Sequence, residues 1–151
     1  MKCIILAGGK GTRISEISKD IPKPMIKILG KPIIWRIMKH YSKYGFKEFI
    51  IAAGYKKKII KDYFKKKNFK DWNVRVVDTG LNTMTGGRIK RLKKFIKEEN
   101  FMLTYGDGLS DVNLKNLLKH HIKSKKYATL TAVRPPARFG AIKLLKDKVI
   151  Y

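Results

Sequence analysis

Short apolar runs alternate along this chain with longer segments in which apolar residues recur every three or four positions. The short runs are rich in Ile, Val, Leu and Ala and predict buried β-strands over 2–7, 48–53, 74–77, 101–105 and 128–133. Two further short runs, 141–145 and 149–151, end the series. The helical pattern covers 31–44, 57–67, 88–97 and 114–124. This alternation predicts an α/β fold with a mostly parallel sheet and helices on both faces.

The loops that follow the predicted strands contain the residues suited to chemistry. All strands of a parallel sheet end at one edge, and ligands bind in the loops beyond that edge. The first such loop contains Gly8, Gly9 and Gly11, whose missing side chains let backbone N–H groups approach an anion. Thr12 and Arg13 add side-chain donors suited to phosphate oxygens. The spacing matches neither a Walker A loop nor the dinucleotide fingerprint, so a plain glycine-rich turn stays an alternative.

Two charged residues stand in similarly defined settings. Lys23 lies between Pro22 and Pro24, which fix the backbone on both sides and favour a phosphate contact. Asp107 follows a predicted strand, between two glycines, and such an accessible carboxylate suits Mg²⁺. Each residue also has a simpler interpretation. Lys23 could be one of many lysines without a function, and Asp107 could belong to an ordinary Gly-Asp-Gly turn.

A third loop runs from Asp78 through Thr83 to Arg88. Its small and hydroxyl residues lead into a predicted helix, and the N-terminus of a helix attracts anions. Arg88 in the first turn is unfavourable for the helix itself, and an anionic ligand there would resolve the conflict. The alternative is an ordinary loop with a solvated arginine.

Composition narrows the class of protein. The chain has 151 residues, which suits one domain over 1–151, with 36 Lys+Arg against 11 Asp+Glu and a net charge of +25. That charge favours anionic partners, although 29 of the basic residues are lysines and only seven are arginines. The single Cys3 lies in an apolar run, which predicts a buried thiol and excludes an internal disulfide. No signal peptide or membrane-length apolar run is present, so we expect a soluble cytoplasmic protein without membrane partners.

Taken together, these segments resemble a known family. The segment 6–13 (Leu-Ala-Gly-Gly-Lys-Gly-Thr-Arg) and Pro22-Lys23-Pro24 resemble the opening signature of the sugar-phosphate nucleotidyltransferases. The segments 83–88 (Thr-Met-Thr-Gly-Gly-Arg) and 135–140 (Pro-Pro-Ala-Arg-Phe-Gly) are similar to the cytidylyl-transferring branch. The resemblance implies a Rossmann-like, doubly wound fold of the nucleotide-diphospho-sugar transferase type.

The resemblance also implies an activity and a role for each matching residue. CTP and α-D-glucose 1-phosphate would give CDP-glucose and pyrophosphate with Mg²⁺ as cofactor, a step in surface-polysaccharide biosynthesis. Arg13, Lys23 and Asp107 would be catalytic, and Asp107 would bind the metal. The implied substrate-binding residues are Leu6, Ala7, Gly8, Gly9, Lys10, Gly11, Thr12, Arg13, Lys23, Thr83, Arg88 and Gly106.

Departures from the family pattern keep other functions open. Relatives continue beyond Tyr151 with a sugar-binding loop and a second metal-binding Asp, so this chain is expected to be C-terminally truncated, with its turnover impaired. A segment that helps relatives associate is shortened between 64 and 74, although a homo-oligomer stays possible. A non-catalytic nucleotide-binding module is the main alternative. A basic nucleic-acid-binding domain is a distant one, since no recognition motif accompanies the charge, and no nucleic-acid partner is expected.

Overall fold

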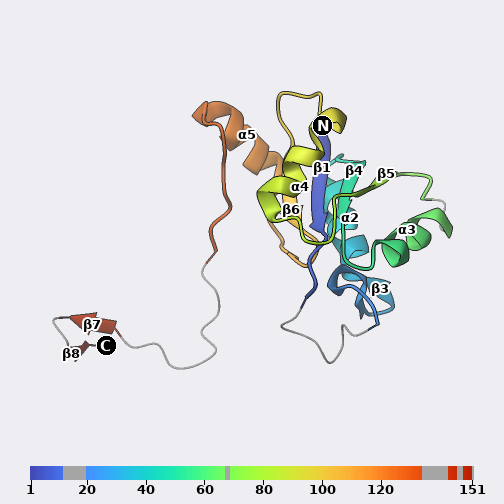
Figure 1. Ribbon diagram of the computed structural model, residues 1–151. Helices are drawn as coiled ribbons and strands as arrows, with labels where there is room; N and C mark the ends of the chain where they lie inside the picture. The colour runs from blue at the N-terminus through green and yellow to red at the C-terminus, as the bar shows by residue number, and fades with distance from the viewer. Residues whose placement is uncertain (12–19, 67–68, 134–142, 146–147, 151) are drawn as a thin grey trace. The chain divides into compact units, whose positions relative to one another are not determined.

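The computed structural model describes residues 1–11, 20–66, 69–133, 143–145 and 148–150 (Figure 1). By its internal contacts the chain divides into two compact units, Met1–Leu114 and Lys115–Tyr151. Each unit is described by itself.

A four-stranded parallel sheet forms the centre of the first unit (Figure 1). Its strands are β1 (Lys2–Ala7), β4 (Glu48–Ala53), β5 (Asn73–Asp78) and β6 (Met102–Tyr105), in the spatial order β5-β4-β1-β6. Each neighbouring pair is parallel and in continuous register. These four predicted strands are confirmed to within one residue at either end, because short apolar runs rich in Ile, Val and Leu give a strong local signal.

Helices cover both faces of this sheet, as predicted. On one face, α2 (Ile33–Lys43) buries Ile34, Ile37 and Met38, and its Tyr41 interacts with Thr104 of β6. On the other face, Ile89 and Leu92 pack against an apolar cluster of strand residues formed by Ile4, Leu6, Ile50 and Ala52. Ile89 belongs to α4 (Thr85–Arg91), and Leu92 follows it directly. The helix α3 (Lys57–Lys66) connects β4 to β5.

Two of the predicted helices have boundaries that are wrong. The helix expected over 88–97 is instead α4 followed by the short 3₁₀ turn η3 (Lys93–Phe95). This helix begins at Thr85 and not at Arg88, so its first turn includes Gly86 and Gly87, which were expected in the loop. The helix expected from Lys31 begins at Ile33, since Lys31–Pro32 forms β3, which pairs with β2 (Lys27–Ile28). The other end of α2 is as expected, since Gly45 follows it with a φ of +88° that favours glycine.

The second unit contains less regular structure than expected. It includes most of the predicted helix α5 (Leu114–Ser124) and the antiparallel pair β7 (Lys143–Leu145) and β8 (Lys148–Ile150). The strand expected over 128–133 is wrong: this segment pairs with no strand in the described part of the chain, and Leu130 is 90% exposed. An extended segment without a ladder partner does not form a strand, whatever its β-propensity. No helix among the described residues is long and apolar enough to cross a membrane.

Cys3 is fully buried near the start of β1, as predicted. Burial raises the pKa of its thiol to about 12, so the reactive thiolate is scarce at neutral pH. We therefore expect Cys3 to resist a thiol reagent at pH 8 in the folded chain and to react fully in urea. Absorbance of the released thiol chromophore measures this, and rapid labelling without urea would contradict the burial of Cys3.

Candidate functional site

The loops that follow the four strands lie in one region, at the carboxyl edge of the sheet. From β1 the chain passes to β4 on one side, and it later returns to β6 on the other. The order of the strands therefore reverses at β1, and such reversal points form the ligand crevices of open α/β sheets. The loops after β1, β4, β5 and β6 all leave from this edge.

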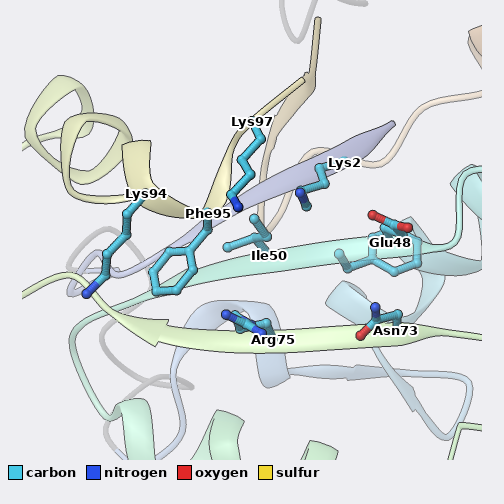
Figure 2. Close-up of a pocket in the computed structure, with 9 residues that line it drawn as sticks. Lys2, Glu48, Ile50, Asn73, Arg75, Lys94, Phe95 and Lys97 are labelled. Carbon is cyan, nitrogen blue, oxygen red and sulfur yellow. The ribbon is translucent and has the colours of Figure 1, made fainter. Parts of the chain in front are cut away.

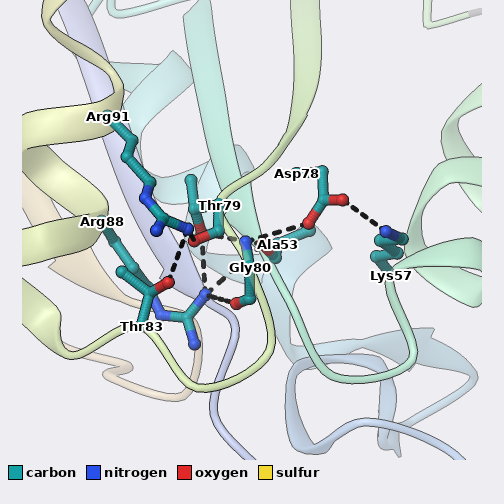
Figure 3. Close-up of polar contacts among 8 residues, drawn as sticks. All are labelled: Ala53, Lys57, Asp78, Thr79, Gly80, Thr83, Arg88 and Arg91. Atoms are coloured by element: carbon teal, nitrogen blue, oxygen red, sulfur yellow. Dashed lines mark hydrogen bonds and ion pairs between the residues drawn. The ribbon is translucent and has the colours of Figure 1, made fainter.

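Arg88 joins two of these loops, and Figure 3 shows its contacts with the loop after β5. Its side chain is only 5% exposed although it carries a charge. The guanidinium donates through Nη2 to the carbonyl oxygens of Gly8 at 2.9 Å and Leu81 at 3.2 Å. Through Nη1 it donates to Thr79 Oγ1 and the Gly80 carbonyl oxygen, both at 2.7 Å. The loops after β1 and β5 are thus tied to α4, and Tyr55, after β4, also donates its N–H to Gly8 at 3.1 Å.

Arg91 lies one turn further along the same helix and reinforces this arrangement. Its Nη1 donates to the carbonyl oxygen of Thr79 and to Thr83 Oγ1, each at 2.7 Å. Thr83 is therefore held in a defined orientation, half-buried at the loop that precedes α4. Arg91 was not predicted as a site residue from the sequence. Its spacing of three from Arg88, on one helix face, was the available signal.

The Pro-Lys-Pro segment meets the loop after β6 on the other side of β1. Gly106 donates its N–H to the Leu6 carbonyl oxygen at 2.8 Å, and a β-carbon at position 106 would lie only 2.7 Å from Pro24. This close packing brings Lys23 Nζ within 2.5 Å of the Asp107 carboxylate, and both side chains are about one-third exposed. A cation and an accessible carboxylate therefore stand together at the switch point of the sheet.

Asp78, at the end of β5, forms an ion pair with Lys57 of α3 (Figure 3). Its other carboxylate oxygen accepts the Gly80 N–H at 3.0 Å. The hydrogen bond from Lys57, followed by that from Gly80, lowers the pKa of the Asp78 carboxyl below its usual value. The pair therefore contributes stability above the usual carboxyl range and loses it as pH falls through the lowered pKa.

Lys57→Met is expected to raise the pKa of Asp78 towards its usual value, because the first cause of its lowering is removed. Carboxyl carbon shifts followed by NMR across the acid range measure this pKa. Lys58→Met is the matched control, since Lys58 is the next residue and is also exposed. Equal Asp78 pKa values in the two variants would contradict the assigned pair.

A cavity of about 580 Å³ lies at the opposite end of the sheet (Figure 2). Lys2, Glu48 and Asn73, the first residues of β1, β4 and β5, line it together with Arg75 and Phe95. Arg75 stacks on the Phe95 ring at 5.0 Å. None of the described residues expected to bind nucleotide lines this cavity, so the described part of the candidate site and the cavity are separate.

The structure brings most of the expected site residues to the same edge. Seven of them stand in the loops or strand ends described above: Leu6, Ala7, Gly8, Lys23, Thr83, Gly106 and Asp107. Arg88 reaches these loops from α4, and Gly9, Lys10 and Gly11 continue from Gly8. Thr12 and Arg13 lie outside the described residues. Within the described ranges, no three His, Cys, Asp or Glu side chains come together as a metal site.

Comparison with known proteins decides the family. The family model described as nucleotidyl transferase matches residues 2–150. The chain belongs to the nucleotidyl transferase family. Within it, the chain is 46% identical to a glucose-1-phosphate cytidylyltransferase of Salmonella typhimurium, a match that covers 99% of this chain and 66% of the relative. It is 42% identical to a probable glucose-1-phosphate cytidylyltransferase of Bacillus subtilis, covering 94% of this chain and 64% of that one.

A solved structure shows the same fold. HddC from Yersinia pseudotuberculosis, complexed with GMP-PN, superposes with a TM-score of 0.71 at 34% identity, over 80% of this chain and 54% of that one. The doubly wound fold implied by the sequence is therefore confirmed. This nucleotidyl transferase chain spans about two-thirds of the length of its curated relatives. The Salmonella alignment runs over 171 positions, more than the 151 residues here, so that relative carries residues which this chain lacks.

Proposed function

We propose that this chain forms the nucleotide-binding part of a cytidylyltransferase acting on α-D-glucose 1-phosphate. The observation that carries the proposal is the meeting of the Gly8–Gly11 loop, Lys23 and Asp107 around the carboxyl end of β1. Gly9 is exposed, and a β-carbon there would meet nothing within 4 Å, so its backbone is open to a ligand. The similarity to glucose-1-phosphate cytidylyltransferases supports CTP as the nucleotide.

The proposed reaction needs positioning and charge neutralisation rather than a protein nucleophile. A phosphate oxygen of the sugar phosphate bonds to the α-phosphorus of CTP. The bond from that phosphorus to the bridging oxygen of the β-phosphate breaks, and its electron pair leaves with pyrophosphate. The attacking oxygen is already anionic, so no side chain has to remove a proton. The Gly9–Gly11 backbone and Lys23 would hold the phosphates in line and offset their charge, with Arg13 as a further proposed contact.

Asp107 fits Mg²⁺ as a partial site. Mg²⁺ is commonly held by one or two carboxylates together with substrate phosphates and water, and Asp107 supplies one accessible carboxylate. The ion pair with Lys23 means that metal and ammonium would share this carboxylate. When bound, Mg²⁺ would neutralise charge on the phosphates.

The proposal is tested by Mg²⁺-dependent release of pyrophosphate from CTP and glucose 1-phosphate, with UTP, dTTP and GTP as controls. Release that requires CTP supports the cytidylyl assignment, and Asp107→Asn should abolish the Mg²⁺-dependent release. Binding of CTP without turnover would instead identify a non-catalytic nucleotide-binding module. Absence of CTP binding would contradict both functions.

A further inference from the structure

Arg88 makes contacts that differ from those expected of a residue that binds the nucleotide through its side chain. Four of its hydrogen bonds, two from each terminal nitrogen, go to carbonyl or hydroxyl oxygens of the loops, at 2.7 to 3.2 Å. Because the guanidinium is buried and its terminal nitrogens are engaged in this way, few donors are left for a phosphate. Its contacts instead fix the backbone on which other residues stand.

The glycine at position 8 is matched to this arginine. A β-carbon at Gly8 would lie 2.1 Å from Arg88 Nη1 and 2.3 Å from its Cζ, and the three nearest atoms all belong to the Arg88 side chain. A β-carbon at Gly9 would meet nothing within 4 Å. Adjacent glycines therefore serve different purposes: the first makes space for the guanidinium, and the second faces open space.

Among the described residues, Arg88 forms no ion pair with a carboxylate. The ion pairs among the described residues join Lys2 to Glu98, Lys23 to Asp107 and Lys57 to Asp78, and none includes Arg88. A buried cation solvated by neutral carbonyl groups is costly, and the cost is offset by several good hydrogen bonds. Lysine could not replace it, since a single ammonium cannot reach Gly8, Gly80 and Leu81 in the same fork.

We propose that Arg88 is a positioning residue, whose guanidinium fixes the carbonyl of Gly8 and thereby orients the Gly9–Gly11 backbone for the triphosphate. The claim that this loop is oriented for the triphosphate rests on the proposed function. The coupling between Gly8 and Arg88 stands on the structure alone.

A double-mutant cycle on the full chain tests this coupling. The variants are Gly8→Ala, Arg88→Ala and both together, with Lys90→Ala as control because Lys90 is exposed on the same helix. Urea midpoints are measured for the parent and for these four variants. Gly8→Ala should lower the midpoint in the parent and much less in the Arg88→Ala background, where the guanidinium is gone. Equal losses in the two backgrounds would overturn the coupling. If Arg88→Ala does not fold, Arg88→Lys takes its place in the same cycle.

The affinity for CTP with Mg²⁺, measured by calorimetry, tests the positioning role. Arg88→Ala should weaken binding by about tenfold, the loss of hydrogen bonds to a charged group, while Lys90→Ala should not change it. Adding guanidinium ion at low millimolar concentration should restore part of the affinity of Arg88→Ala, because the ion fits the space left behind. Parental affinity in Arg88→Ala would overturn the proposal. If the parent binds no CTP, the proposed function fails, and the urea midpoints still decide the coupling.

Discussion

Replacing Phe49 with alanine is expected to lower the free energy of unfolding by about 3–5 kcal/mol. Phe49 belongs to β4, an inner strand of the sheet, and is only 2% exposed. Its ring meets Trp72 edge-on at 5.9 Å, and Trp72 in turn stacks on Phe69 at 5.2 Å. Truncation would remove buried area and leave a cavity beside a rigid aromatic group, which cannot easily collapse into it.

Urea unfolding followed by tryptophan fluorescence measures this loss. Phe101→Ala is the matched control, since Phe101 is 39% exposed and buries much less of its ring. For a domain whose total stability is of the order of 5–15 kcal/mol, the difference between the two variants should be plain. Similar losses in both would contradict the central place of Phe49 in the core.

Gly106→Ala is expected to weaken CTP binding by about tenfold and to destabilise the fold by about 1–3 kcal/mol. The added β-carbon would lie 2.7 Å from Pro24 Cγ and 3.1 Å from the Leu6 carbonyl oxygen. To relieve these contacts, the Pro22–Pro24 segment would have to move away from the loop after β6. Lys23 and Asp107, now 2.5 Å apart, would then separate. The phosphates of CTP would no longer meet these two groups side by side, so binding would weaken.

Gly108→Ala offers a close control for this prediction. Two residues further along the same loop, a β-carbon would meet Thr104 Oγ1 at 3.5 Å and the Tyr105 carbonyl oxygen at 3.7 Å, which is ordinary contact. Urea midpoints and calorimetric titration with CTP separate the two variants. If Gly108→Ala loses as much stability as Gly106→Ala, the packing of Pro24 on Gly106 does not explain the effect.

Much of the fold could be predicted from the sequence, because the four strands of the sheet are short apolar runs and the two inner ones, β1 and β4, are buried almost throughout. The strand expected over 128–133 shows the limit of this reasoning. Its residues have strong β-propensity, yet a strand also needs a partner, and local sequence does not supply one. The boundaries of α4 failed for a similar reason, since Gly86 and Gly87 are typical of loops but here lie within the helix.

The position of the candidate site could be predicted from the sequence, whereas the contacts of some of its residues could not. Strand ends mark the edge of a parallel sheet, so the loops with Gly8 and Asp107 were expected on the same edge, whereas the pairing of Lys23 with Asp107 was not predicted. That Gly8 accommodates Arg88 is a long-range fact, involving residues 80 positions apart. One signal was present: in a chain with 29 lysines, arginines at 88 and 91 indicate a need for the guanidinium fork.

The most direct test of a nucleotide site at this edge is an amide NMR map of the chain with CTP and Mg²⁺. We expect shifts at Gly9, Lys10, Gly11, Lys23, Gly106 and Asp107, with little change at Lys2, Arg75, Lys94 and Lys97, which line the cavity at the opposite end. Shifts confined to that lysine-rich cavity, or spread evenly over the basic surface, would contradict the assignment of the site to the carboxyl end of β1.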